Sequence, residues 1–319
     1  MTDAAGDEAT GATAACASPE EGPAQALTLA GSRWTLEHGV LRAEARDPDG
    51  VARLGIVGDV AAADGAELAA LGALVAALRT RRVEALIAPG GLGGGAPGAA
   101  ARVLDVLVSA GVPVLVGTGA TERAGDLAAA LGARGAAAFG LARVTRVEGD
   151  DFTLVPLSGH ALARAVVPGA CRAGAAELER AARAAKDAPE PRVLVSHGPP
   201  RVGGEGGIDR AGTAVIGAFP VAAWLAASGV RFGVFGDVAE TAGTACDAHG
   251  GPVAPGAWAA ELLLNAGRVD ALPPPGKAVP EDAVAARGGV AVASVLELHA
   301  GSAGAAPSAA FERVALPVH

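Results

Sequence analysis

From Val51 onward the chain repeats one pattern: a short apolar run, a Gly-rich loop, and an Ala- and Leu-rich stretch with helical spacing. Short apolar runs bounded by Gly or Pro are typical of buried strands. The predicted strands are 54–57, 85–88, 112–116, 152–157, 193–196 and 232–235. The predicted helices are 66–80, 97–110, 122–131, 175–185 and 221–228, with Pro97 at a first helical position. This alternation predicts βαβ units and a largely parallel sheet.

The two ends of the chain depart from this pattern. Residues 33–45 are expected to form a small hairpin or an edge strand, and 288–298 and 309–316 to form strands that complete a second sheet. The Gly- and Pro-rich loops are too short to be domain linkers. We therefore expect a single domain over residues 31–319, preceded by a disordered, acidic, Ala- and Gly-rich tail over residues 1–30.

Composition and charge exclude several classes of function. Half of the 319 residues are apolar, which is enough for a large core, and the net charge of −9 comes without a basic cluster. These features argue against nucleic acid or an anionic membrane as a partner. No apolar run is long enough to span a bilayer, and the N-terminus lacks the features of a signal peptide, so we expect a cytoplasmic protein. The three scattered cysteines form no CxxC pair, which excludes a zinc knuckle or a disulfide framework.

Candidate chemistry lies in the loops that follow the predicted strands, because ligands of parallel sheets bind at the carboxyl ends of strands. Five such loops stand out: 58–61, 90–94, 119–122, 196–200 and 236–240. Ser158 and His160 also lie close in sequence, but proximity alone does not make a catalytic dyad. No Gly-x-Ser-x-Gly elbow follows any strand, which argues against a serine hydrolase.

The order of the five loops resembles the calcineurin-like metallophosphoesterase family. Successive strand ends in that family carry Asp-x-His, Gly-Asp-x-x-Asp, Gly-Asn-His-Asp/Glu, a lone His and Gly-His-x-His. The resemblance covers about residues 54–298. It implies a four-layer α/β/β/α sandwich with two mixed sheets. In the family, two divalent metals lie between the loops and are bridged by the Asp of the second motif.

Most of the family's ligands are replaced in this chain. Asp59, Glu122 and His197 match their motifs, and Asp237 stands where the first His of the last motif is expected. Gly91 takes the place of the bridging Asp, and Thr121 that of the His that assists the leaving group. The other replaced positions are Ala61, Gly94, Ala120 and Ala239.

We therefore predict a catalytically inactive pseudoenzyme, without catalytic residues or a resident cofactor, that acts as a binding, scaffold or regulatory module for a protein partner. One alternative is a single-metal phosphoesterase in which Asp59, His197 and Asp237 share one Mn²⁺, Fe²⁺ or Zn²⁺ ion. Another is a small-anion or nucleotide binder that uses the 90–95 loop, because a helix N-terminus presents free N–H groups.

Overall fold

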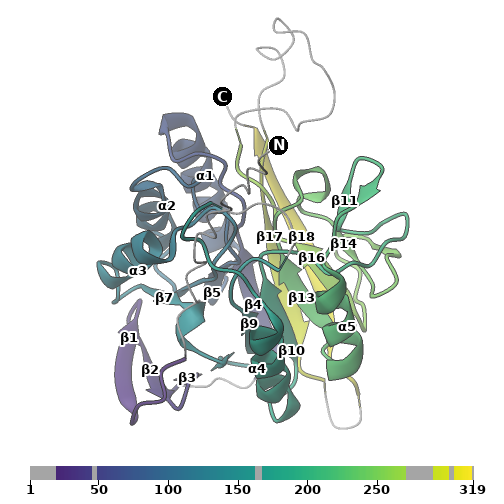
Figure 1. Ribbon diagram of the computed structural model, residues 1–319, viewed down its shortest axis with the longest axis horizontal. Coiled ribbons are helices and arrows are strands. Elements are labelled where there is room, and N and C mark those ends of the chain that lie inside the picture. Colours follow the sequence, from purple (N-terminus) through teal and green to yellow (C-terminus); the bar gives the residue numbers. More distant parts are fainter. Residues whose placement is uncertain (1–18, 45–48, 162–166, 271–289, 302–304, 318–319) are drawn as a thin grey trace, which may run out of the picture.

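Two large mixed sheets stack face to face, with helices on both outer faces (Figure 1). The computed structural model describes residues 19–44, 49–161, 167–270, 290–301 and 305–317. The arrangement confirms the four-layer α/β/β/α sandwich predicted from the sequence. None of the helices in these ranges is long and apolar enough to cross a membrane.

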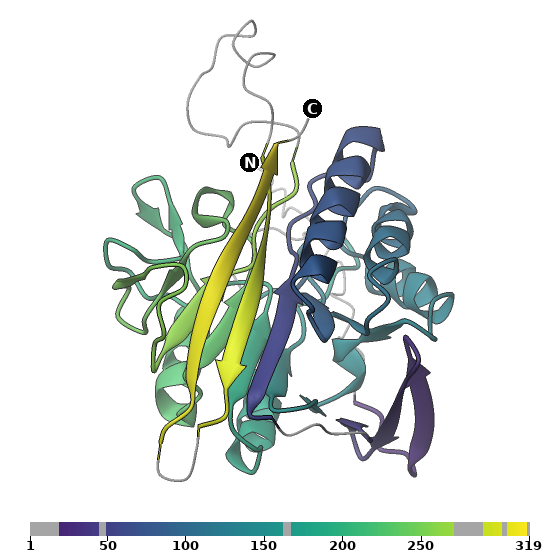
Figure 2. The ribbon, with the colours of Figure 1, turned by 180° about the vertical axis from the view of Figure 1, so that it is seen from behind.

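The smaller sheet has six strands in the order β18-β17-β4-β5-β6-β7. Strands β4 to β7 run parallel to one another, while β17 is antiparallel to both β4 and β18 (Figure 2). The strands are β4 (Val51–Ile56), β5 (Ala85–Ala88), β6 (Val114–Val116), β7 (Ala138–Gly140), β17 (Val290–His299) and β18 (Ser308–Pro317). Its helices are α1 (Gly65–Thr80), α2 (Ala99–Val108) and α3 (Ala124–Gly132).

The larger sheet has ten strands in the order β1-β2-β3-β8-β9-β10-β13-β16-β14-β15. Its centre, from β9 to β16, is parallel. The strands are β1 (Gln25–Leu29), β2 (Ser32–Glu37), β3 (Val40–Ala43), β8 (Arg146–Glu148), β9 (Thr153–Leu157), β10 (Arg192–Ser196), β13 (Phe232–Phe235), β14 (Ala245–Cys246), β15 (Pro252–Val253) and β16 (Leu262–Asn265). The remaining elements are α4 (Ala175–Lys186), α5 (Phe219–Ser228), the pair β11 (Arg210–Ala211) and β12 (Ala214–Val215), and the 3₁₀ turns η1 (Leu141–Arg143) and η2 (Ala239–Thr241).

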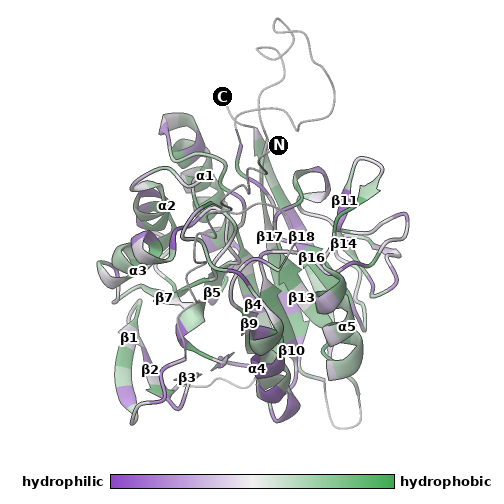
Figure 3. Cartoon of the chain, viewed as in Figure 1, coloured by the Kyte–Doolittle hydropathy of each residue, from purple (hydrophilic) through white to green (hydrophobic). Residues whose placement is uncertain are grey.

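Three apolar layers hold this arrangement together. The middle layer joins the inner faces of both sheets, for example through Ile56, Ile87, Val195 and Phe232. A second layer packs α1 to α3 on the six-stranded sheet, and a third packs α4 and α5 on the ten-stranded sheet. The apolar residues accordingly concentrate in the central strands, whereas α4 is largely hydrophilic toward solvent (Figure 3). Strands that are buried on both faces explain the continuous apolar runs in the sequence.

Most predicted elements are present, with small differences at their ends. The predicted hairpin over 33–45 is formed by β2 and β3. The prediction for Pro97 is wrong: α2 begins at Ala99, because Gly98 adopts a left-handed φ of 69° that a helix cannot include. The last part of the segment expected as a tail forms β1, which pairs with β2. Residues 1–18 lie outside the described ranges.

Glu84 directly precedes β5 and lies near the carboxylates of Asp49, Asp150 and Asp151. Its Oε1 accepts the amide hydrogen of Arg53 at 2.8 Å. Burial, the largest cause, raises the pKa of Glu84 from 4.5 to about 7; the Arg53 amide lowers it, and Asp150, Asp49 and Asp151 raise it. Because the pKa is higher in the folded state, the stability that Glu84 contributes is complete below its unfolded pKa and is lost as the pH rises through about 7.

The variant Glu84→Gln keeps an acceptor for the Arg53 amide and removes the charge. We expect it to be more stable than the wild type near pH ~8, by about 1 kcal/mol or less because the side chain is partly exposed, and equally stable near pH ~4. Thermal unfolding followed by circular dichroism at both pH values tests this. Glu205→Gln, in an exposed loop, is the control. An equal gain for Glu84→Gln at both pH values would contradict the assignment.

Candidate functional site

The five loops singled out in the sequence meet at one edge of the sandwich. Strands β4, β5 and β6 are parallel neighbours in one sheet, and β10 and β13 are parallel neighbours in the other. Carboxyl ends of parallel strands lie on the same edge of a sheet, so the loops that follow them converge. The contacts described below join loops from both sheets.

Asp59, His197 and Asp237 come together at this edge. His197 Nε2 lies 3.9 Å from Asp59 Oδ1 and 3.6 Å from Asp237 Oδ1. The imidazole is buried, whereas the side chains of Asp59 and Asp237 are 20% and 11% exposed. Asp59 Oδ2 also accepts the backbone amide hydrogen of Asp237. The sequence thus predicted which three side chains meet at this edge.

Both aspartates occupy unusual backbone conformations. Asp59 has φ +49° and Asp237 has φ +72°, in the left-handed region that Asp tolerates better than most residues. Strained positions of this kind concentrate at functional sites. Burial raises the pKa of Asp59 to about 6; the charge of His197 lowers it, and the charge of Asp237 raises it. The loop geometry therefore holds two carboxylates close together in a partly dehydrated position.

A further side chain, His160, lies in the same cluster and was missed as a candidate ligand. It follows β9, and its ring centroid lies 5.6 Å from that of His197. One ligand atom each from His160, His197 and Asp237 lie within 4.8 Å of one another. The sequence does carry a signal for His160, because this residue follows the apolar run 152–157 and Gly159. It lies outside the five loops that resemble the family's motifs.

The donor set suits one borderline divalent ion. Two imidazoles and a carboxylate are common ligands of Zn²⁺, Fe²⁺ and Mn²⁺. With metal–ligand bonds of about 2.1 Å, tetrahedral ligands lie roughly 3.4 Å apart, so the three donors would have to move slightly closer together. His197 Nδ1 is buried without a hydrogen-bond partner among the described residues, so this nitrogen is not committed to another group.

The backbone at Gly91 occupies the space that a bridging carboxylate would need. A Cβ atom at Gly91 would lie 2.3 Å from Asp59 Oδ1 and 2.9 Å from Asp59 Cα. The φ of Gly91 is +78°, in the left-handed region. Gly90 also packs closely: a Cβ there would lie 2.9 Å from His197 Nδ1 and 2.7 Å from Gly119 Cα. The residues present therefore do not fit a two-metal centre.

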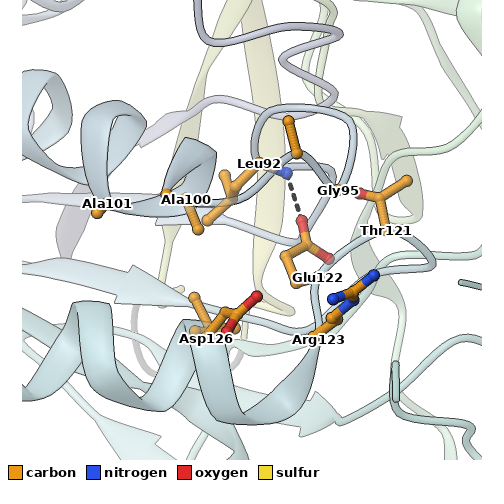
Figure 4. A pocket seen from close by; sticks show the side chains of 11 residues that line it. Leu92, Gly95, Ala100, Ala101, Thr121, Glu122, Arg123 and Asp126 are labelled. Carbon is orange, nitrogen blue, oxygen red and sulfur yellow. Dashed lines mark hydrogen bonds between the residues drawn. The ribbon is translucent and has the colours of Figure 1, made fainter. Parts of the chain in front are cut away.

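Glu122 connects the second and third loops. Its Oε1 accepts the amide hydrogen of Leu92 (Figure 4). Its Oε2 accepts the amide hydrogen of Gly119 at 2.8 Å. The small adjoining pocket, of ≈ 40 Å³, is lined by two acidic residues, Glu122 and Asp126, and one basic residue, Arg123. A carboxylate of the protein already uses an amide of the 90–95 loop, and the net negative charge of the lining disfavours a second anion. These contacts count against the anion-binding alternative.

Two other polar residues hold the loops in place. Buried Asp209 accepts the amide hydrogens of Val202 at 3.1 Å and Gly203 at 3.4 Å. The Asn265 side chain, at the end of β16, donates to the carbonyl of Val238 at 2.8 Å and to the Thr241 hydroxyl. Both residues therefore organise the edge of the sandwich by hydrogen bonds to neighbouring loops.

An open cavity of ≈ 240 Å³ lies beside the two aspartates. Asp59, Asp237, Thr121 and Arg268 line it. Arg268 forms an ion pair with Asp270, so its positive charge is already largely compensated. Without a bound ion the cavity carries a net negative charge and would repel a phosphate group.

Comparisons with known proteins concern the fold. No family model matches the sequence, and no curated protein matches it. Among solved structures, TT1561 of Thermus thermophilus is 14% identical, with 69% of this chain and 90% of that one covered, at a TM-score of 0.47. A dimetal phosphatase from Danio rerio is 12% identical (85% and 100% covered, TM-score 0.46). A further solved structure is 11% identical (84% and 100% covered) and has a TM-score of 0.53. The last of these structures, with its TM-score above 0.5, supports the mixed α/β fold described above.

Proposed function

We propose that this protein is a metallophosphoesterase-like binding module that lacks two-metal phosphoester hydrolysis. The observation that carries the proposal is the packing of Gly91 against Asp59, which leaves no room for a carboxylate that bridges two ions. Two-metal hydrolysis depends on ions held about 3.5–4 Å apart on either side of the reacting phosphate. Thr121 adds a second deficit, because it replaces the imidazole expected to assist the leaving group. A protein partner and a scaffold or regulatory role remain predictions.

A single-metal phosphoesterase is the second candidate, and the grouping of His160 with His197 and Asp237 favours it. A bound divalent ion would supply Lewis acidity and would lower the pKa of a water ligand. His160 and His197 would hold the ion from β9 and β10, and Asp237 from β13. Asp59 and Arg268 also line the cavity beside these residues, with Arg268 already paired to Asp270.

Metal content and phosphodiester turnover together distinguish the two candidates, because one bound ion with turnover would support the single-metal enzyme. The apoprotein is incubated with Mn²⁺, Fe²⁺ or Zn²⁺, desalted and analysed by elemental mass spectrometry. Because Gly91 cannot bridge two ions, we expect at most one ion per chain and no turnover of bis(p-nitrophenyl) phosphate. If one ion is retained, His197→Ala and His160→Ala should each reduce its affinity at least about tenfold. His249→Ala, in an exposed loop, is the matched control. Two ions per chain with phosphodiester turnover would refute the proposal.

Changes at Gly91 test the packing directly. Gly91→Ala should destabilise the protein by roughly 2 to 4 kcal/mol. The added Cβ would clash with Asp59, and a φ of +78° is unfavourable for any residue other than glycine. Gly111→Ala is the matched control, since Gly111 has a similar φ of +72° and nothing within 4 Å of the added carbon. It should cost only about 1 kcal/mol.

Gly91→Asp reintroduces the family's side chain at that position. We expect it to lose stability without gaining a second ion in the same elemental analysis. Urea unfolding gives the free energies of all three variants. A stable Gly91→Asp protein with two bound ions would show that the loop can open and that the backbone does not prevent a two-metal site.

A further inference from the structure

A second cavity, the α3 slot, lies behind the loop that carries His160, since its lining residues Thr118 and Cys171 accept the amide hydrogens of Gly159 and His160. Its volume is ≈ 310 Å³, and it shares no lining residue with the cavity beside Asp59. One wall is the face of α3 that carries Ala124, Leu127, Ala128 and Leu131, spaced i, i+3, i+4 and i+7. The opposite wall comes from β6 and β7. The slot is thus a separate space between a helix and the edge of the six-stranded sheet.

Small residues keep the slot open. Its lining includes Gly132 at the end of α3 and Ala138 in β7, where longer side chains would fill the space. A Cβ atom added at Gly132 would meet nothing within 4 Å. The walls are mostly aliphatic, so water in the slot forms few hydrogen bonds with them. An apolar chain that displaced this water would gain the free energy of burial.

Arg143 is the one charged residue among the described residues that line the slot. Its Nε donates to Glu20 Oε1 at 2.8 Å, and its Cζ lies 4.6 Å from the ring centroid of Phe139. The side chains of Arg143 and Glu20 are 41% and 38% exposed, so this pair is held weakly. The guanidinium has five donors, and a ligand carboxylate can use those that Glu20 leaves available.

We propose that the α3 slot binds a small aliphatic monocarboxylic acid, with its chain along α3 and its carboxylate on Arg143. At about 30 Å³ per water-sized group, the slot holds roughly ten such groups, which matches an acid the size of octanoate. Buried Thr118 and Cys171 also line the slot. Thr118 Oγ1 accepts the amide hydrogen of Gly159 at 2.7 Å, which fixes this part of the lining.

Isothermal titration calorimetry of the full chain with octanoate and, separately, octanol tests the proposal. Ala128→Phe places a ring in the slot. Ala129→Phe is the matched control, since Ala129 is the next residue of the helix and is exposed like Ala128 but does not line the slot. Gly132→Leu is a second blocking variant, used if Ala128→Phe unfolds. Thermal unfolding confirms that each variant is folded.

We expect saturable binding of octanoate to the wild type and to Ala129→Phe, and its loss in Ala128→Phe and Gly132→Leu. Arg143→Gln should weaken octanoate roughly fivefold to tenfold and leave octanol unchanged, because only the acid uses the guanidinium. Absence of saturable octanoate binding, or equal binding by folded Ala128→Phe and Ala129→Phe, would overturn the proposal. Equal weakening of octanol by Arg143→Gln would overturn the role of the charge.

Discussion

The apolar contact between the two sheets determines where every functional loop lies. Ile56 and Ile87 from one sheet and Val195 and Phe232 from the other belong to the same buried layer. This packing holds the parallel strands of both sheets with their carboxyl ends at one edge. Side chains separated by well over a hundred positions in the chain therefore meet there, as Asp59 and His197 do. The site depends on that alignment more than on any bond within it.

At this edge, much of the packing is between backbone atoms rather than between side chains. In a two-metal site, carboxylates and imidazoles separate the loops and the ions balance their charge. In this protein the second and third loops approach through Gly90 and Gly119, and Glu122 joins them by accepting two amide hydrogens. A histidine and two aspartates remain in contact beside them, and His160 adds a second imidazole. The loops are thus stabilised by the chain's own polar groups.

Local patterns in the sequence predicted the strands and helices well. The runs 85–88 and 232–235 coincide with β5 and β13, because both are continuous apolar segments bounded by Gly, Pro or charged residues. β16 was not predicted, since its short Leu run is not followed by a helix and falls outside the repeated pattern. The pairing of β17 with β4 joins segments more than two hundred residues apart. Local periodicity carries no information about such a contact.

The candidate site was predicted only in part, for a related reason. Asp59, His197 and Asp237 stand at motif positions, so their convergence followed from the fold. The position of His160 next to them depends on how far the loop after β9 reaches across the edge. The close approach of Gly91 to Asp59 depends on the distance between two backbones, and no residue pattern reports that distance.

This approach also bears on which residues position 91 can accept as the sequence varies. A side chain there would begin 2.3 Å from Asp59 Oδ1, on a backbone whose φ favours glycine. A substitution would therefore carry a folding cost unless the neighbouring loops moved apart, which requires changes at other positions. Selection for stability alone is thus enough to keep a glycine at this position, whatever the edge of the sandwich binds.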